Sequence, residues 1–404
     1  MTKLNELQGN LPELNVGVVG HIDHGKTTLL SKLTGKFTDT HSEELKRGIT
    51  IKLGYSETTI YEDNGKYNNK QQGKPIRYIS FIDAPGHEML MATMLSGAAI
   101  IDAAILVVAA NEGIKPQTKE HFMALQANNI KDLIIIQNKI DLVTKEQALK
   151  NYKEIKEFLK GTLAENAPII PVSAQQEINI DKIFEQLANI KIPEKDSSSK
   201  PIFLVARSFD INKPGTNVES LKGGVLGGIL KKGKLTVGDV IEIKPGMDVK
   251  KHRGEISYKT LITKIISLQK GSKSLNEIGP GASISIETSL DPFLTKSDSL
   301  KGCLVSLEGN LPEPSYRIKL KTSLFDEVSG LGVRKKVESI KPKEMLMLSI
   351  NTTITVGTVE KISNDGTDIE LSLNIPIVFL KGDNAGIARN IESHWRLIGY
   401  GEIL

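Results

Sequence analysis

Residues 20–27 read Gly-His-Ile-Asp-His-Gly-Lys-Thr, which is the G-x-x-x-x-G-K-[ST] form of a phosphate-binding loop. The apolar run at 16–19 predicts a buried strand before the loop, and leucines at 29, 30 and 33 predict a helix after it. Glycines let consecutive backbone N–H groups turn toward phosphate oxygens, and the start of a helix adds partial positive charge. A glycine-rich turn that binds nothing is the alternative, but it would not require the lysine and the threonine. The stretch therefore predicts a site for a nucleoside triphosphate.

The residues of this loop and of its junction with the helix are expected to contact the nucleotide: Asp23, His24, Gly25, Lys26, Thr27 and Thr28. The Lys26 ammonium can reach the β- and γ-phosphates, and the Thr27 hydroxyl can ligate Mg²⁺. His24 is expected to shape the loop rather than to take part in chemistry. Asp23 leaves two possibilities open: it holds a second Mg²⁺ together with the Gly48 carbonyl, or it caps the loop.

The composition is that of a globular protein large enough for two or three domains. The chain has 404 residues, of which 39% are hydrophobic and 25% charged, and its net charge of +4 is too small to indicate nucleic acid by itself. Its one cysteine, Cys303, allows no intramolecular disulfide. The apolar segment 98–110 contains Asp102 and is shorter than the ~20 residues of a membrane span, and residues 1–15 lack the apolar core of a secretory signal. We therefore expect a cytoplasmic protein that does not enter a membrane.

Five apolar runs in the first half alternate with helical spacing, which is typical of a mostly parallel α/β sheet. The runs are 16–20, 78–83, 103–109, 133–138 and 169–173. Ligands of such sheets bind beyond the carboxyl ends of the strands, and most of these runs end in polar residues. We therefore expect further functional residues directly after the strands.

Two segments contain candidates for handling the γ-phosphate. An acidic residue that closes a buried strand is costly unless it meets a cation, so Asp83 is expected to hold Mg²⁺ through water; a capping aspartate before a turn is the alternative. The Gly86 amide can sense the γ-phosphate, and a neutral His87 can orient the attacking water or merely shape the turn. Residues 43–51 form a candidate switch, in which Thr50 completes the Mg²⁺ shell only while the γ-phosphate is present, or else an ordinary solvated loop.

Two further strand ends predict that the base is guanine. The Asp141 carboxylate can accept hydrogen bonds from N1–H and the 2-amino group of guanine, which adenine does not offer. The Lys139 stem can cover the base, and Asn138 can tie this loop to the phosphate-binding loop. The last strand end carries Ser173, Ala174 and Gln175. A backbone N–H there can reach guanine O6. Each motif is weak alone, but their order after successive strands predicts binding of GTP and GDP.

The helical spacing stops after a polar, serine-rich linker at 194–200, and short apolar runs punctuated by glycine and proline predict closed antiparallel β structure. The proline-containing stretch Leu-Pro-Glu-Pro at 311–314 indicates a boundary between two barrels. The expected fold is an α/β P-loop GTPase domain at 1–197, followed by antiparallel β-barrel domains at 198–311 and 312–404. Basic residues of the first barrel can contact RNA phosphates, although such residues are more often simply solvated.

The motifs together resemble those of the translational GTPases, in particular relatives of elongation factor Tu. They lie at 20–27, 47–50, 83–87, 138–141 and 173–174. Three further stretches resemble the gamma subunits of archaeal and eukaryotic translation initiation factor 2. They are Arg-Ser-Phe-Asp-Ile-Asn-Lys-Pro-Gly at 207–215, Leu-Lys-Gly-Gly-Val at 221–225 and Trp-Arg-Leu-Ile-Gly-Tyr-Gly-Glu-Ile at 395–403. The resemblance covers essentially the full length, and the short N-terminus is closer to archaeal members.

This resemblance implies a GTPase that hydrolyses GTP to GDP and phosphate on start-site selection. It implies alpha and beta subunits as partners in a heterotrimer, which carries initiator methionyl-tRNA to the small ribosomal subunit. It also places His87 beside the hydrolytic water, and Thr27 and Thr50 on Mg²⁺. In some states of the family Asp23 and Gly48 hold a second Mg²⁺. The alternative within the superfamily is an elongation-type carrier of aminoacyl-tRNA, general or selenocysteine-specific.

A polar insertion at 62–74 departs from the pattern of many family members, which carry a four-cysteine zinc knuckle there. The insertion reads Glu-Asp-Asn-Gly-Lys-Tyr-Asn-Asn-Lys-Gln-Gln-Gly-Lys and contains no cysteine, so no zinc is expected. Asn64-Gly65 favours a turn, and we expect the segment to be a mobile loop.

Overall fold

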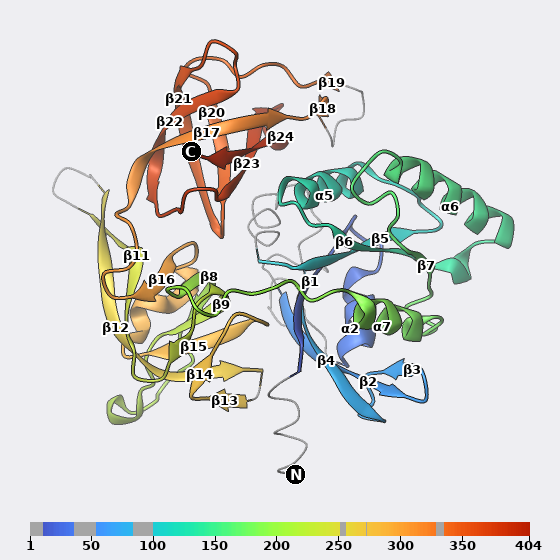
Figure 1. The fold of residues 1–404 in the computed structure, drawn as a ribbon, viewed down its shortest axis with the longest axis horizontal. Helices are drawn as coiled ribbons and strands as arrows, with labels where there is room; N and C mark the ends of the chain where they lie inside the picture. The colour runs from blue at the N-terminus through green and yellow to red at the C-terminus, as the bar shows by residue number, and fades with distance from the viewer. Residues whose placement is uncertain (1–10, 36–53, 84–99, 251–255, 272, 329–334) are drawn as a thin grey trace. The chain divides into compact units, whose positions relative to one another are not determined.

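The computed structural model describes residues 11–35, 54–83, 100–250, 256–271, 273–328 and 335–404. The chain divides into two compact units (Figure 1). Unit 1 contains residues 1–193 with the segments 325–337 and 391–398, and unit 2 contains the remainder.

Unit 1 is built on a seven-stranded sheet with the strand order β3-β2-β4-β1-β5-β6-β7 (Figure 1). Five strands run parallel: β1 (Glu13–Gly20), β4 (Lys74–Asp83), β5 (Ala103–Ala109), β6 (Asp132–Asn138) and β7 (Ile169–Pro171). At one edge, β2 (Gly54–Asp63) and β3 (Lys66–Asn68) are antiparallel. The predicted mostly parallel sheet is therefore confirmed.

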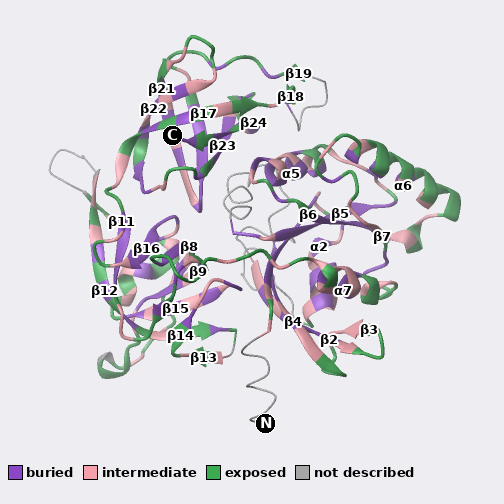
Figure 2. Cartoon of the chain, viewed as in Figure 1, coloured by how far each residue is buried: buried purple, intermediate pink, exposed green. Residues whose placement is uncertain are grey.

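Helices cover both faces of this sheet, which explains why its central strands are apolar without alternation. They are α2 (Lys26–Thr34), α5 (Pro116–Ala127), α6 (Lys145–Leu159) and α7 (Ile180–Asn189). Apolar residues of α2 and α7 pack in one cluster with β1 and β5, whereas α5 meets α6 through Phe122 and Phe158, whose ring centroids lie 5.2 Å apart. Every residue of β5 is buried (Figure 2). No helix in the described part of the chain is long and apolar enough to span a membrane.

The cysteine-free insertion continues the sheet instead of forming the mobile loop that the sequence predicts. β2 and β3 make a hairpin around Asn64 and Gly65, which take left-handed φ values of 50° and 76°, as an Asn-Gly turn favours. The Asn69 side-chain amide donates to the last carbonyls of α2, Lys32 O at 3.3 Å and Leu33 O at 3.0 Å. These bonds satisfy backbone acceptors that a helix end leaves open. The insertion is thereby fixed to the helix that follows the phosphate-binding loop.

Two closed antiparallel β-barrels follow along the chain, as predicted. The first barrel closes because β11 pairs with β12 as well as with β16. Its strands are β8 (Ile202–Phe209), β9 (Val225–Lys232), β11 (Val240–Lys250), β12 (Ile256–Lys270), β15 (Ile284–Thr288) and β16 (Leu304–Leu307). The second has the order β17-β22-β21-β20-β23-β24. Its strands are β17 (Ser315–Leu324), β20 (Met345–Ile350), β21 (Thr353–Ile362), β22 (Asp368–Ile377), β23 (Asn384–Ile391) and β24 (His394–Ile403).

Short elements connect these strands. They are β10 (Leu235–Thr236), β13 (Lys273–Leu275), β14 (Glu277–Ile278), β18 (Glu327–Val328) and β19 (Lys335–Lys336), with the 3₁₀ turns η3 (Val218–Ser220) and η4 (Pro292–Asp298). Along β12 buried Leu261 and Ile265 alternate with exposed Ile262 and Ile266, the period of a strand with one face in a barrel core. The domain limits at 197 and 311 remain predictions.

Candidate nucleotide-binding site

The phosphate-binding loop runs from the end of β1 to the start of α2, and close packing requires its two glycines. Gly20 has φ 143°, and a Cβ there would lie 2.4 Å from the backbone oxygen of Val107 in β5. Gly25 precedes α2 with φ 87°, and a Cβ there would lie 2.4 Å from Nδ2 of Asn138 in β6. A side chain at Gly20 would displace the backbone of β5, and one at Gly25 would displace the side-chain amide of Asn138. The loop therefore lies against the carboxyl ends of β5 and β6, where ligands of a parallel sheet bind.

Lys26 is buried, and its ammonium group lies inside this loop. Nζ donates to the backbone oxygens of Gly20 at 2.9 Å and of His21 at 2.8 Å. The first turn of α2 carries no acidic residue, so no carboxylate there offsets the partial positive charge of the helix N-terminus. The ammonium group and the helix end together suit the phosphates of a nucleotide.

Thr27 and Asp83 supply oxygen ligands that fit a divalent cation. The Thr27 hydroxyl lies 3.4 Å from Oδ2 of Asp83, and the pairing of β4 with β1 sets Asp83 opposite Val18, next to the loop. The Asp83 side chain is fully buried, where a carboxylate is costly without a cation. Among the described residues, no three or more His, Cys, Asp and Glu side chains gather as a metal cluster. The pair fits Mg²⁺, which takes one or two protein ligands beside water and phosphate oxygens.

The His24 ring is buried and fixes the shape of the loop. Its Nδ1–H donates to Val107 O at 3.2 Å, while Nε2 lies 3.9 Å from Oε2 of Glu112. Burial lowers the pKa of His24 to about 3, so the ring is neutral at physiological pH. A neutral ring with one N–H directed at a strand carbonyl acts as a spacer between the loop and β5.

The sequence predicts only a surface or packing role for His121, but the structure places this residue in the site. It lies on α5, is buried, and accepts the N–H of Gly20 at its Nδ1 over 2.9 Å. Burial, followed by the charge of Lys26, lowers the pKa of His121 to about 3. The available signal was its spacing, because His121 follows Gln117 by four residues and shares a helix face with it.

Asn138 joins the segments that the sequence assigns to phosphate and base. Its Nδ2 donates to His24 O at 2.9 Å in the phosphate-binding loop. Its Oδ1 accepts the N–H of Ala174 at 3.0 Å in the loop after β7. One amide therefore connects three loops at the carboxyl edge of the sheet, which matches the tie expected from the sequence.

The residues expected to recognise the base follow Asn138 along the chain or lie in the loop after β7. Lys139 has φ 61°, and its Nζ lies 3.8 Å from Oε1 of Glu112. Asp141 lies in the short helix η2 (Ile140–Leu142) and is exposed, so its carboxylate is accessible to a base. In the loop after β7, Ser173 and Ala174 are buried and Gln175 is exposed. This arrangement presents one carboxylate and one loop backbone to the same edge.

Four predicted site residues, Gly48, Thr50, Gly86 and His87, lie outside the described residues. Thr28 lies in the first turn of α2. Asp23 is exposed with φ 59°, and both of its predicted roles stay open. The described candidates after β1, β4, β6 and β7 are brought together at one edge of the sheet.

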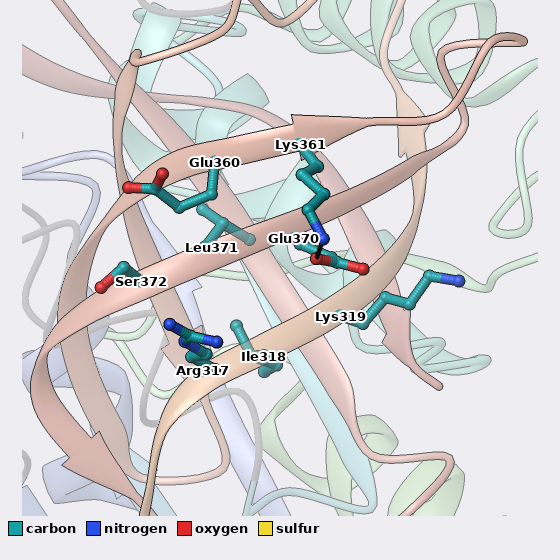
Figure 3. A pocket seen from close by; sticks show the side chains of 8 residues that line it. All are labelled: Arg317, Ile318, Lys319, Glu360, Lys361, Glu370, Leu371 and Ser372. Carbon is teal, nitrogen blue, oxygen red and sulfur yellow. Dashed lines mark ion pairs between the residues drawn. The ribbon is translucent and has the colours of Figure 1, made fainter.

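A hollow of about 580 Å³ lies on the C-terminal barrel over β17, β21 and β22 (Figure 3). Its charged lining residues are Arg317, Lys319, Glu360, Lys361 and Glu370. Lys361 pairs with Glu370 at 3.2 Å, so opposite charges largely offset each other there. Strand residues line the hollow, which therefore lacks the helix N-terminus that accompanies Lys26 in the phosphate-binding loop.

Two family models match this chain. The model described as "Elongation factor Tu GTP binding domain" matches residues 12–193. The model described as "Initiation factor eIF2 gamma, C terminal" matches residues 316–403. The first match contains the phosphate-binding loop and the segments that Asn138 connects.

Full-length relatives and solved structures agree with these matches. A protein named translation initiation factor 2 subunit gamma from Archaeoglobus fulgidus is 50% identical over 97% of this chain and 95% of its own. The protein of the same name from Pyrococcus horikoshii is 50% identical over 97% of both chains. The crystal structure of the bacterial selenocysteine-specific elongation factor EF-Sec is similar over 97% of this chain, with a TM-score of 0.75 and 25% identity. This chain spans 58% of the length of that structure.

Proposed function

This chain belongs to the translation initiation factor 2 gamma family of translational GTPases, and from that premise we propose that it carries initiator methionyl-tRNA to the small ribosomal subunit. In this proposal it acts with alpha and beta subunits as a heterotrimer. It binds GTP with Mg²⁺ and hydrolyses GTP to GDP and phosphate when the start site is selected. A cytoplasmic location and the absence of bound zinc remain predictions.

The observation that carries the nucleotide part is the pair of bonds made by Asn138. Because its amide joins the phosphate-binding loop to the loop after β7, the phosphate and base contacts have a fixed spacing. Asp141, three residues later, then meets N1–H and the 2-amino group of guanine, and adenine would leave this acceptor unpaired. Lys139 covers the base with its stem, and its ammonium stays near Glu112.

At the other end of the nucleotide, Lys26 and the start of α2 hold the β- and γ-phosphates. Thr27 and Asp83 would hold Mg²⁺, which neutralises phosphate charge when bound. Thr50 would join them while the γ-phosphate is present, and Asp23 with Gly48 would hold a second Mg²⁺. The Gly86 amide would contact the γ-phosphate, and a neutral His87 would orient the attacking water.

The initiation role is favoured over an elongation-type carrier by the match of residues 316–403 and by the two relatives named as gamma subunits. Binding of initiator methionyl-tRNA can be compared with binding of elongator aminoacyl-tRNAs, using the chain with its alpha and beta subunits and a non-hydrolysable GTP analogue. We expect at least a tenfold preference for the initiator, a difference of about 1.4 kcal/mol. Equal affinities for all aminoacyl-tRNAs would favour the elongation-type carrier.

A further inference from the structure

Helix α5 contacts the phosphate-binding loop through two side chains on one face. Nδ1 of His121 accepts the N–H of Gly20 at 2.9 Å, and Oε1 of Gln117 accepts the N–H of Ile22 at 3.5 Å. Residues four apart on a helix are neighbours on its surface, so the two acceptors stand one turn apart. α5 therefore accepts hydrogen bonds from the N–H groups of Gly20 and Ile22 in the first half of the loop.

The backbone of Gly20 is held from two directions. Its N–H is bonded to His121, and its carbonyl oxygen accepts Nζ of Lys26 at 2.9 Å. Its φ of 143° and the nearby oxygen of Val107 exclude a side chain, so Gly20 is held through its backbone alone, by these bonds and by the pairing of β1 with β5. His121 therefore helps to orient the Gly20 carbonyl, which is one of the two backbone acceptors of the Lys26 ammonium.

The imidazole suits this position because it is neutral and presents an acceptor. Since Nδ1 accepts, the ring proton lies on Nε2. The ring is buried on α5, so replacing it by an apolar side chain would leave the Gly20 N–H buried without this acceptor. Leaving a buried donor unsatisfied costs more than the net strength of the bond itself.

We propose that His121 is a positioning residue of the nucleotide site, which holds the Lys26 ammonium in place through Gly20 and so slows dissociation of the guanine nucleotide. This inference rests on the proposed function, because it concerns the nucleotide bound by the loop. His121 contacts the loop backbone and not the reacting atoms, so the selectivity for guanine is independent of it.

Three variants of the full chain distinguish the effect of losing the hydrogen-bond acceptor from the effect of changing the size of the side chain. His121→Asn places Oδ1 near the position of Nδ1, His121→Gln moves the acceptor outward, and His121→Leu removes it while filling the space. Dissociation of N-methylanthraniloyl-GDP in the presence of Mg²⁺ is measured by stopped flow. We expect the Leu and Gln variants to release it at least about fivefold faster, and the Asn variant within about twofold of the unmodified chain.

Each result of this experiment has a distinct meaning. Thermal unfolding identifies a variant that does not fold, and the comparison of the two polar variants, Asn and Gln, then decides the question. Equal release rates for the unmodified chain and all folded variants would overturn the proposal. A changed preference for GDP over ADP in a folded variant would also overturn it. An unmodified chain that does not bind the probe would instead contradict the proposed function.

Discussion

The side-chain amide of Asn138 donates to the backbone oxygen of His24 at 2.9 Å, across 114 positions of sequence. This bond joins the end of β6, where we propose that the base is recognised, to the middle of the phosphate-binding loop. The same Nδ2 lies where a Cβ at Gly25 would come within 2.4 Å, so the two segments approach as closely as glycine permits. The loops proposed to bind the phosphates and the base are thus parts of one hydrogen-bonded assembly.

Replacing Asn138 by Ala is expected to weaken both the fold and the site. The His24 oxygen and the Ala174 N–H would lose a buried partner, which lowers the free energy of unfolding by about 1–3 kcal/mol. GDP affinity should fall at least about tenfold by calorimetry. Asn351→Ala is the control, because it removes a buried amide bonded to Asp383 in the second barrel. A loss of affinity of the same size in both variants would contradict a direct role.

The Asp141→Asn substitution should change which base is preferred. An amide donor at this position faces the 2-amino donor of guanine unfavourably but can pair with the 2-oxo acceptor of xanthine. We expect GTP binding to weaken at least about a hundredfold and xanthosine triphosphate binding to strengthen. Competition between the two nucleotides measures the switch. Unchanged GTP affinity would show that Asp141 does not contact the base.

Removal of the Thr27 hydroxyl should uncouple nucleotide affinity from Mg²⁺. The observed approach of this hydroxyl to Asp83 at 3.4 Å suggests that both serve one cation. In Thr27→Ala the ratio of GTP affinity with Mg²⁺ to that with a chelator should fall toward one, whereas Thr27→Ser, which keeps the oxygen, should retain it. The ratio is obtained from titrations under both conditions. A Mg²⁺ dependence that persists in the Ala variant would contradict this assignment.

His87→Ala is expected to slow hydrolysis without loss of nucleotide binding. A positioned catalytic side chain contributes roughly 10²–10⁴-fold to a rate, so the rate of hydrolysis stimulated by the small ribosomal subunit should decrease by a factor in that range. Single-turnover measurement with radiolabelled GTP separates this step from binding. His394→Ala, which changes an exposed histidine of β24, serves as the control. A stimulated rate equal to that of the unmodified chain would contradict the role of His87 in orienting water.

Stability should fall between pH 6.5 and 5 because two histidines are buried in the neutral form. The pKa values of His24 and His121 are about 3 when folded, against an ordinary value of 6.5. Below pH 6.5 the unfolded chain binds protons that the folded chain does not, so the free energy of unfolding decreases as the pH falls. Above pH 6.5 the two groups do not change the free energy of unfolding. Each adds a slope of up to about 1.4 kcal/mol per pH unit.

Urea unfolding at pH 7, 6 and 5 measures this dependence, over a range in which most carboxylates stay ionised. The His121→Asn variant keeps an acceptor for Gly20 but does not titrate. It should therefore show a shallower decrease than the unmodified chain. An identical pH dependence in both chains would show that His121 does not remain neutral when folded.

Local spacing was enough to predict the elements that carry the nucleotide motifs. The five parallel strands were recognised because continuous apolar runs end in polar residues, and β5 has the predicted bounds of Ala103 and Ala109. β7 ends at Pro171, two residues before the predicted end, and Ser173 instead bridges Ile178 outside the sheet. The insertion was misjudged because its polar residues pair with β2 and cap α2, and polarity alone does not distinguish a solvated hairpin from a loop.

The sequence by itself determined that a phosphate-binding loop, a strand-ending carboxylate and a guanine-type motif follow one another in the order of a mostly parallel sheet. These are short motifs, and their residues lie next to one another along the chain. Only the tertiary structure decided that His121 accepts the N–H of Gly20, 101 positions away. That bond depends on how α5 packs beside β1, and the periodicity of a helix reveals which face is buried but not which backbone group that face will meet.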